Sequence, residues 1–448
     1  MNPSNPGFTT LDDWIAREAA SCSLDAPEEF NAAVDQLIAA LGDGVELLGL
    51  GEALHGGEAI LLLRNRLFQR LAERHGYTAI AIESSWARSR LVNEYVGGVG
   101  AATIRPTAYE AVQEAGFSHA CGRLTANREL VELLRTYNAD EARSTKLRFY
   151  GFDSSTEMGG AESPRRPLTF ALGYLDSMAD AAGRRHRARI EALLGADADW
   201  ENPAAAFDAA KSIGQSPQAT TLRAAVEDLI GELRLYRAAA ATPDAADRWS
   251  EAMHYATSAR DLLNYHAEMA LASDDRTARL LGMRDAQMAD NLAYIAACER
   301  GRGKVLVFAH NAHLQRSPAQ WQWGPNLLVW QPAGAHLHTL FGARYAVVGS
   351  GVGVSDENGI GEPEDGTLEA RLTAFSAASS SAPNSAATFI PTHRGRGLPP
   401  AEIAALPIRT GSARNPGYFP LKPQSLTDFD AICLVSSTPY SRGATPLP

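Results

Sequence analysis

The sequence is poor in cysteine and has no long apolar run. Its four cysteines, Cys22, Cys121, Cys298 and Cys433, lie far apart and form no CxxC pair. This spacing excludes a disulfide framework and a zinc-ribbon pattern, and Cys433, inside an apolar run, is expected to be a small buried hydrophobe. No run approaches the roughly 20 apolar residues that a membrane-spanning helix needs.

Positive charge is also in deficit. The 448 residues include 41 Lys plus Arg against 52 Asp plus Glu, which gives a formal net charge of −11. Because nucleic acids and anionic membranes attract basic proteins, we expect neither as a partner, and a small molecule is the expected ligand. The beginning of the chain shows no basic segment followed by an apolar one, so we predict a cytoplasmic protein. The oligomeric state is left open.

Several catalytic signatures are missing. The sequence contains no GxSxG nucleophile elbow, no Walker A loop and no HExxH motif. The glycines between Gly349 and Gly353 follow a strand-like run but lack the GxGxxG spacing, which disfavours dinucleotide binding. A serine hydrolase is therefore disfavoured, and no cofactor is expected.

Six short apolar runs are present, each of strand length. They are Val45–Gly51, Tyr77–Ile82, Leu147–Phe152, Val305–Ala309, Tyr345–Gly349 and Phe429–Val435. Continuous apolarity is typical of strands buried on both faces, so the runs predict a mostly parallel sheet. Helical periodicity at Gly57–His75, which Gly76 ends, and at Thr125–Asn138 predicts an α/β fold with helices flanking that sheet.

The middle of the chain has a different character. From about 168 to 300 it is rich in alanine and helical in pattern, with breaks near 199–203 and 213–218. We interpret 161–300 as an all-helical insertion over an active-site cleft, and 1–160 and 301–448 as the two parts of the α/β core. The polar, low-complexity stretch Ser376–Ala387 is interpreted as a mobile loop or linker.

Polar side chains gather where four of the apolar runs end. They are Glu52 and His55 after the first, Glu83 after the second, Asp153 after the third, and His310 and His313 after the fourth. Ligands of open α/β sheets bind outside the carboxyl ends of the strands. If the four strands are parallel, these groups converge at one edge.

Glu52 and His55 are three residues apart in a strand-to-helix turn. A carboxylate beside an imidazole raises its basicity and orients it, which suits a general base. The alternative is that Glu52 caps the next helix and His55 is an ordinary turn residue. The convergence with the other strand ends favours the catalytic interpretation. Glu83 needs a partner if it is half-buried, and Arg64 is the candidate, in a structural or a catalytic ion pair.

The polar residues that remain are compatible with more than one role. The His310–His313 spacing is compatible with a metal site completed by His55 or a glutamate, but without a third clear ligand we favour metal-free acid–base chemistry. Asp153 either orients His55 or caps the segment after it. Arg284 and Asp285, on an amphipathic helix, resemble an exposed charge pair.

Three more histidines, His119, His254 and His266, have no such context. We expect them to be surface or core residues.

The ordered set of motifs resembles the erythromycin esterase family over roughly 45–350 and 405–440. The residues that carry the resemblance are Gly51 to Gly56 (GEALHG), Glu58, Arg64, Glu83, Gly151-Phe152-Asp153, Met283-Arg284-Asp285 with Met288 and Asn291, Ala309 to His313 (AHNAH), Gly417-Tyr418-Phe419 and Phe429-Asp430-Ala431. The resemblance implies an α/β core with a helical part over the cleft. It also implies hydrolysis of a macrolide lactone ester with neither a covalent serine intermediate nor an essential metal.

The resemblance also implies roles by position. His55 is the general base that activates water, Glu52 and Glu83 orient and polarise it, and Arg64 holds the carboxylates. His310 stabilises the developing oxyanion or protonates the leaving alkoxide.

The resemblance also implies which residues contact the substrate. His313 and Arg284 assist at the oxyanion, and Asp153 and Glu58 are expected to contact the substrate. Two segments depart from the family, 377–400 and the stretch around 117–127 (FSHACGRLTAN), which lacks the aromatic residues expected there. Both are candidates to border the substrate, so family membership does not fix its identity.

Metal-independent hydrolysis of an ester or macrolactone is therefore the leading prediction. The alternative is a biosynthetic enzyme that uses the same groups for elimination, cyclisation or acyl transfer on a natural product. Two further hypotheses are a binding protein with a degenerate site and a metallohydrolase.

Overall fold

The computed structural model describes residues 7–97, 106–157, 160–380, 382 and 385–445. The strands of the central sheet are β1 Ala20–Ser23, β2 Leu47–Glu52, β3 Tyr77–Ser85, β4 Arg148–Asp153, β7 Lys304–His310, β10 Tyr345–Val354, β11 Ala386–Pro391 and β12 Ala431–Ser437. Two hairpins stand outside it, β5 Thr156–Glu157 with β6 Gly160–Ala161 and β8 Ala319–Trp323 with β9 Asn326–Trp330.

The sheet is mostly parallel, as the apolar runs predict. Its order is β1-β11-β12-β10-β2-β7-β3-β4, and the six strands from β12 to β4 all run parallel. All six predicted strands form. The sequence analysis missed β11 and β1, which pair antiparallel at one edge. β1 is a four-residue Ser/Ala/Cys segment, and β11 begins inside the low-complexity stretch.

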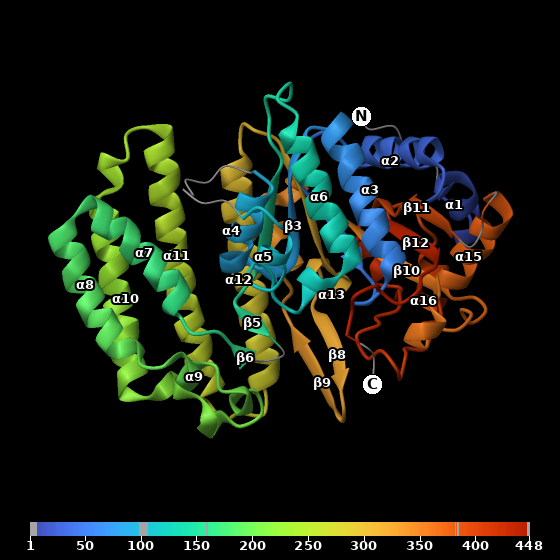
Figure 1. The fold of residues 1–448 in the computed structure, drawn as a ribbon. Coiled ribbons are helices and arrows are strands. Elements are labelled where there is room, and N and C mark those ends of the chain that lie inside the picture. The colour runs from blue at the N-terminus through green and yellow to red at the C-terminus, as the bar shows by residue number, and fades with distance from the viewer. Residues whose placement is uncertain (1–6, 98–105, 158–159, 381, 383–384, 446–448) are drawn as a thin grey trace.

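Helices cover both faces of the sheet (Figure 1). Their bounds are α1 Leu11–Glu18, α2 Pro27–Leu41, α3 Glu58–Arg74, α4 Trp86–Tyr95, α5 Glu110–Gln113, α6 Thr125–Ala139, α7 Arg165–Met178, α8 Asp180–Leu194, α9 Asp197–Trp200, α10 Pro217–Leu235, α11 Pro243–Met269, α12 Arg276–Glu299, α13 Asn311–Leu314, α14 Ala333–Phe341, α15 Leu368–Ser379, α16 Pro400–Ala405 and α17 Ser425–Asp428. Alternate strand residues enter separate cores: Leu48 and Leu50 of β2 pack with α2, α3 and α6, whereas Leu47 packs with α1, α12, α14 and α15. This two-sided burial explains why the strands read as continuous apolar runs.

Between β6 and β7, all the elements of the described chain are helical. The bundle of α7, α8, α10 and α11 stands beside the sheet, next to α12, which packs on β4 and β7 (Figure 1). The chain breaks near 199–203 and 213–218, as predicted, and also at 236–242 and 270–275, which the sequence analysis missed.

The interpretation of Ser376–Ala387 as a loop or linker is wrong at both ends. Ser376 is fully buried in α15, and Ala386 and Ala387 belong to β11. Small Ser and Ala side chains here allow close packing of α15 on β10 and β12 rather than flexibility. Residues 381, 383 and 384 of this stretch lie outside the described residues.

The strand order places a crossover point at the centre of the sheet. The connection from β2 to β3 crosses β7 toward one edge of the sheet. The connection from β7 to β10 crosses β2 toward the other edge. In open α/β sheets the ligand crevice lies at such a point, outside the carboxyl ends. Here those ends are Glu52 of β2 and His310 of β7, which are directly paired in register.

Candidate active site

The Glu52–His55 pair lies at the carboxyl end of β2. Nδ1 of His55 is 2.5 Å from Oε1 of Glu52, and the His55 side chain is 59% exposed while that of Glu52 is 7% exposed. Loss of solvent on the inner side of the ring lowers the pKa of His55, but the carboxylates of Glu52 and Glu83 outweigh it and raise that pKa to about 9. The pair therefore presents a strongly basic imidazole to the open side of the sheet edge.

The turn that carries His55 is held by the C-terminal part of the chain. Gly56 adopts a φ of +92°, which favours glycine. Asn415 donates from Nδ2 to the His55 carbonyl at 3.1 Å, and Ser441 donates from its backbone N to the Gly56 carbonyl at 3.0 Å. Segments far apart in the sequence thus fix the backbone of the predicted base.

Glu58, which was predicted to contact the substrate, belongs to this anchor. Its carboxylate accepts from the backbone N of Arg442 at 3.0 Å and from its Nε at 2.7 Å. Glu58 is 4% exposed and follows the turn as the first residue of α3. The structure therefore does not bring it together with the other predicted groups.

A buried network of charges lies beyond His310, on the β3 and β4 side. Arg284 of α12 donates to both oxygens of Asp153, at 2.9 and 2.7 Å, and from Nη2 to Oε1 of Glu83 at 2.9 Å. Burial favours the neutral acid, but His313, His55 and Arg284 hold the pKa of Glu83 well below its usual range. Arg284, predicted as half of an exposed charge pair, is instead the centre of this network.

The predicted pairing of Arg64 with Glu83 was wrong. Arg64 is 1% exposed, donates to Oδ1 of Asn65 at 3.1 and 2.7 Å and lies over the ring of Phe308. Burial lowers the pKa of Arg64 to about 10, with the charge of Glu52 as the largest opposing influence. Its guanidinium therefore lies near Glu52 without an ion pair to either glutamate.

Asp153 had two predicted roles, of which one was to orient His55. It pairs instead with Arg284 and His119.

His313 lies between two carboxylates. Nδ1 is 2.8 Å from Oδ1 of Asp285 and Nε2 is 3.4 Å from Oε1 of Glu83. Burial opposes the charged ring, but Asp285 and Glu83 raise the pKa of His313 to about 10. Asp285, fully buried, also accepts from Nε1 of Trp330 at 2.7 Å, so the network is tied to the β8–β9 hairpin.

His310 is held in a neutral state. Nδ1 accepts from the backbone N of Ala312 at 3.2 Å, and Nε2 lies 3.0 Å from the Gly417 carbonyl, to which it donates. Burial, followed by the charges of His55 and His313, lowers the pKa of His310 to about 3. Both ring nitrogens are thus engaged by the backbone, which disagrees with the predicted role as oxyanion donor or acid. Its backbone N donates to Oε2 of Glu83 at 2.9 Å, and its ring centroid is 5.2 Å from that of His55.

The residue after His310 fixes the neighbouring strands. Asn311 donates to and accepts from the backbone of Ser350 in β10, at 2.8 and 3.0 Å. A Cβ on Gly51 would lie 2.1 Å from Oδ1 of Asn311. Glycine is therefore required at position 51 of β2 for the Asn311 side chain to pass β2 and reach Ser350 in β10.

Sequence reasoning missed two residues of the network, His119 and Asp285. Nε2 of His119 is 2.8 Å from Oδ2 of Asp153, and the backbone of His119 is left-handed, with a φ of +55°. No spacing signal points to His119, because its partner follows 34 residues later on another strand. Asp285 had one usable signal, since a charge on a helix that packs against the sheet needs a partner.

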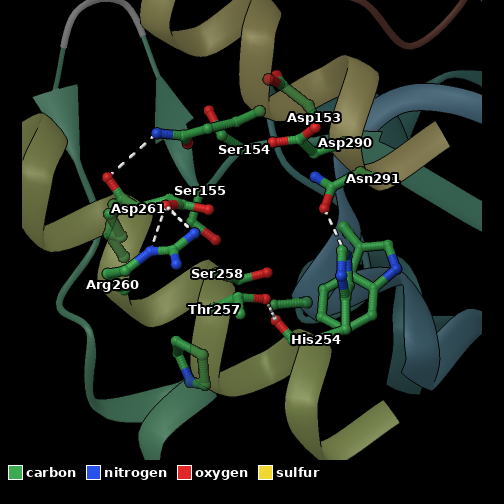
Figure 2. A pocket seen from close by; sticks show the side chains of 15 residues that line it. Asp153, Ser154, Ser155, His254, Thr257, Ser258, Arg260, Asp261, Asp290 and Asn291 are labelled. Carbon is green, nitrogen blue, oxygen red and sulfur yellow. Dashed lines mark hydrogen bonds and ion pairs between the residues drawn. The ribbon is translucent and has the colours of Figure 1, made fainter. Parts of the chain in front are cut away.

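A cavity of about 190 Å³ opens on the far side of Asp153 (Figure 2). It lies between the end of β4 and helices α11 and α12, and its polar lining includes Ser154, Thr257, Asp261 and Asp290. His254 forms part of the wall, with Nε2 2.8 Å from Oδ1 of Asn291 and its ring stacked on Tyr294. Burial lowers the pKa of His254 to about 4, so it is a neutral wall residue.

The described residues contain neither a cluster of metal-ligating side chains nor a membrane-spanning helix. In the ranges that the structure covers, no three or more His, Cys, Asp or Glu side chains are arranged to hold a metal ion. Within the same described part of the chain, no helix combines the length and the apolarity that crossing a bilayer requires. All four cysteines are free, and Cys433 is buried as predicted.

The fold and the charged edge are those of an α/β protein with acid–base side chains at the carboxyl ends of a parallel sheet. The sequence model of the erythromycin esterase family matches residues 72–438. The chain therefore belongs to the erythromycin esterase family, as the resemblance indicates. The matched range contains Glu83, Asp153, Arg284, His310 and His313 and begins after the Glu52–His55 turn.

Individual relatives agree with this assignment. The chain is 24% identical over 355 residues to "Erythromycin esterase type II" of Escherichia coli, a match covering 76% of each sequence. Three solved structures share the fold. A Bacillus cereus protein has a TM-score of 0.72, 15% identity and coverage of 97% and 98% of the two chains. A succinoglycan biosynthesis protein has a TM-score of 0.69 and 17% identity, and the match covers 97% of this chain and 98% of that one. A mutant erythromycin esterase in its open conformation has a TM-score of 0.61 and 18% identity, and the match covers 94% of this chain and 98% of that one.

Proposed function

We propose that this protein hydrolyses a carboxylic ester or lactone, with His55 as the general base that activates water. The observation that carries the proposal is the Glu52–His55 pair, in which a buried carboxylate holds one ring nitrogen of an exposed imidazole. Nδ1 is occupied by Glu52, so Nε2 is the ring nitrogen that would accept a proton from water. General bases in enzymes are commonly oriented by a second group in this way.

In the proposed reaction, Nε2 of His55 takes a proton from water as the water oxygen attacks the ester carbonyl. Glu52 stabilises the imidazolium that forms. Collapse of the tetrahedral intermediate breaks the bond to the leaving alkoxide, which takes the proton back from His55. Water and ester are thereby converted to one acid and one alcohol, and the mechanism needs neither a metal ion nor a cofactor.

The negative charge that develops on the carbonyl oxygen needs hydrogen-bond donors. Arg284 commits Nε and Nη2 to carboxylates, but Nη1 has no carboxylate partner in the described part of the chain and lies 3.4 Å from Nε2 of His313. We assign Arg284, with His313 behind it, to the oxyanion. Preorganised donors of this kind typically contribute about 10²–10³-fold to kcat.

The remaining members of the site act through other groups in this proposal. Glu83 and Asp153 fix Arg284, and Glu83 also holds the charge on His313. His310 positions Glu83 through its backbone N and packs beside the ring of His55. Neutral His310 adds no positive charge that would disfavour protonation of His55.

A macrolide lactone is the substrate class to test first. The support for it is membership in the erythromycin esterase family and the similarity to an esterase of that name. The assay is mass spectrometry of products after incubating wild type, His55→Ala and His75→Ala with a panel of macrolides and simple lactones. His75 is a matched control because it pairs with Asp35 at the end of α3 far from the turn.

We expect one substrate to gain the mass of one water with wild type and His75→Ala, and His55→Ala to react about 10²–10⁴-fold more slowly. Equal rates for His55→Ala would contradict the assignment of the base. A product that changes without gaining water would identify the biosynthetic alternative, an elimination, cyclisation or acyl transfer that uses the same base. A ligand retained unchanged would identify a binding protein.

A further inference from the structure

Lysine is scarce in this chain, and one lysine is placed unlike the others. Of the 41 basic residues, four are lysines: Lys146, Lys211, Lys304 and Lys422. Lys146 donates to the Asp140 carbonyl, Lys304 lies over the ring of Tyr77, and Lys211 is exposed. Lys422 lies in the segment after Phe419, half-buried, and lines a cavity.

The ammonium group of Lys422 has no counter-ion among the described residues, and no hydrogen bond or ion pair joins its Nζ to any of them. Burial lowers the pKa of Lys422, and no carboxylate opposes that effect. Because Lys422 is only half-buried, an anion supplied by a ligand can reach its ammonium group and would stabilise the charged form.

The cavity around Lys422 has a volume of about 360 Å³ and two kinds of wall. Gln320 provides an amide donor on this wall, whereas Nε2 of Gln315 already donates to the Ser317 and Pro318 carbonyls and Nε2 of Gln424 to Oγ1 of Thr427. Pro318, Phe419, Pro420 and Phe429 provide an apolar surface beside them. This combination suits a ligand with an anionic head and an apolar body.

The carboxylate in this cavity does not neutralise Lys422. Asp428 accepts from the backbone N of Ser317 at 3.1 Å and from its Oγ at 2.5 Å. Burial raises the pKa of Asp428, and the positive charge that acts on it is that of Arg316. Asp428 is therefore satisfied by Ser317, in the segment after α13, and forms no ion pair with Lys422 in the described part of the chain.

The cavity adjoins the catalytic edge through one aromatic side chain. Phe419 lines the cavity and packs edge-on against the ring of His310, with centroids 4.7 Å apart. Its backbone N donates to the Ala53 carbonyl at 2.8 Å, in the turn that leads to His55. A ligand in the cavity thus lies one side chain away from the proposed site of hydrolysis.

We infer that this cavity binds the carboxylate of an amphipathic organic acid, with Lys422 as its counter-ion and Phe419 and Phe429 against its apolar body. An ester hydrolase releases a ligand of this class, so the identity of the natural ligand as the product acid rests on the proposed function. Binding of a carboxylate in the cavity does not.

The test uses the scarcity of lysine. The lysine amines of the full-length protein are labelled by reductive ¹³C-methylation, which keeps their charge. The four lysine signals are assigned with single Lys→Arg variants and titrated with sodium hexanoate. We expect the Lys422 signal alone to shift in a saturable way, and its pKa to rise, because an anion stabilises the charged form. Hexanamide, which lacks the charge, and inorganic phosphate, which lacks the apolar body, should bind at least about tenfold more weakly.

Unlabelled variants, titrated by calorimetry, provide the second measurement. Lys422→Met should weaken hexanoate binding by about tenfold or more, whereas Lys422→Arg and the surface control Lys211→Met should retain it. An unshifted Lys422 signal at saturating hexanoate, or wild-type affinity in Lys422→Met, would overturn the inference. Phosphate binding as tightly as hexanoate would overturn the assignment to an amphipathic acid.

His55→Ala separates this inference from the proposed function. It should bind hexanoate as wild type does, whether or not any ester is hydrolysed. If no hydrolysed substrate is found, the carboxylate site still stands on the hexanoate titration. If hexanoate does not bind, the hydrolysis assay still decides whether His55 is the base.

Discussion

The two halves of the catalytic edge are built in opposite ways. The Glu52–His55 pair is local, its members three residues apart in sequence, and its imidazole is open to solvent. The buried network joins two strands, a long helix, the residues after β7 and the segment after α5. Its members are Glu83, His119, Asp153, Arg284, Asp285 and His313. Both halves contain a histidine with a raised pKa, but a single carboxylate hydrogen-bonds to His55 and two lie against His313.

The difference in burial suggests different roles for the Glu52–His55 pair and the buried network. An exposed imidazole reaches a substrate and exchanges protons readily. A buried arginine with carboxylates on two sides cannot lose its charge or move without leaving those carboxylates unpaired. We therefore expect substitutions in the Glu52–His55 pair to change catalysis and pH dependence, and substitutions in the buried network to change stability as well.

The largest effect is expected for Arg284→Met. Removing the guanidinium leaves Asp153 and Glu83 buried and without their shared cation, which should lower the free energy of unfolding by about 3–5 kcal/mol and abolish activity. Urea unfolding followed by circular dichroism measures the first, and ester hydrolysis the second. Arg184→Met is the control because Arg184 pairs with Asp180 at the surface, where ion pairs contribute less than about 1 kcal/mol. Equal stability of the two variants would contradict the idea that the buried network contributes more to stability than a surface ion pair.

A smaller and more specific effect is expected for Glu52→Gln. Glu52 is the largest of the influences that raise the pKa of His55 to about 9. In the wild type, the neutral base becomes available as the pH rises toward 9, so kcat/KM should increase up to that pH. In Glu52→Gln the rise should end at lower pH, nearer the usual imidazole value of about 6.5, with a lower plateau because the base is weaker.

The pH profile of kcat/KM provides this measurement, and Glu46→Gln is the control, since Glu46 pairs with Arg344 in an exposed position. A wild-type kcat/KM that already reaches its plateau below about pH 7 would show that the carboxylate does not set the basicity of His55.

The smallest effect concerns stability in alkali. Folded His313 keeps its proton up to about pH 10, whereas the unfolded chain releases it near 6.5. This stabilisation is therefore complete below about pH 6.5 and is lost as the pH rises toward 10. We expect Tm to fall between about pH 7 and 9.5 in the wild type and to fall less in His313→Gln. His55→Gln should flatten the curve less, because its ring is exposed. The reverse order of the two variants would contradict the division between an exposed pair and a buried network.

The apolar pattern of the sequence predicts most of the fold because it reports burial. Strands buried on both faces read as continuous runs, and each of the six runs is a strand of the parallel sheet. The edge strand β1 is made of small and polar residues, and its partner β11 lies more than 360 residues away in the sequence. A local pattern carries no information about such a partner.

The site shows the same limit. Glu52, His55, Glu83, Asp153, His310 and His313 are all found at strand ends, where the parallel sheet must bring them to one edge. Which arginine serves Glu83 was predicted wrongly, because Arg64 is near in sequence whereas Arg284 reaches it from a helix 201 residues further on. The orientation of the His310 ring also depends on a distant group, the Gly417 carbonyl.

The anchoring of the His55 turn has a consequence for how the geometry of the Glu52–His55 pair responds to loosening elsewhere in the chain. Asn415, 360 residues further on, holds the His55 carbonyl, and Ser441 holds the Gly56 carbonyl. We therefore expect local unfolding of the segments on either side of β12 to release this turn while the remainder of the sheet stays formed.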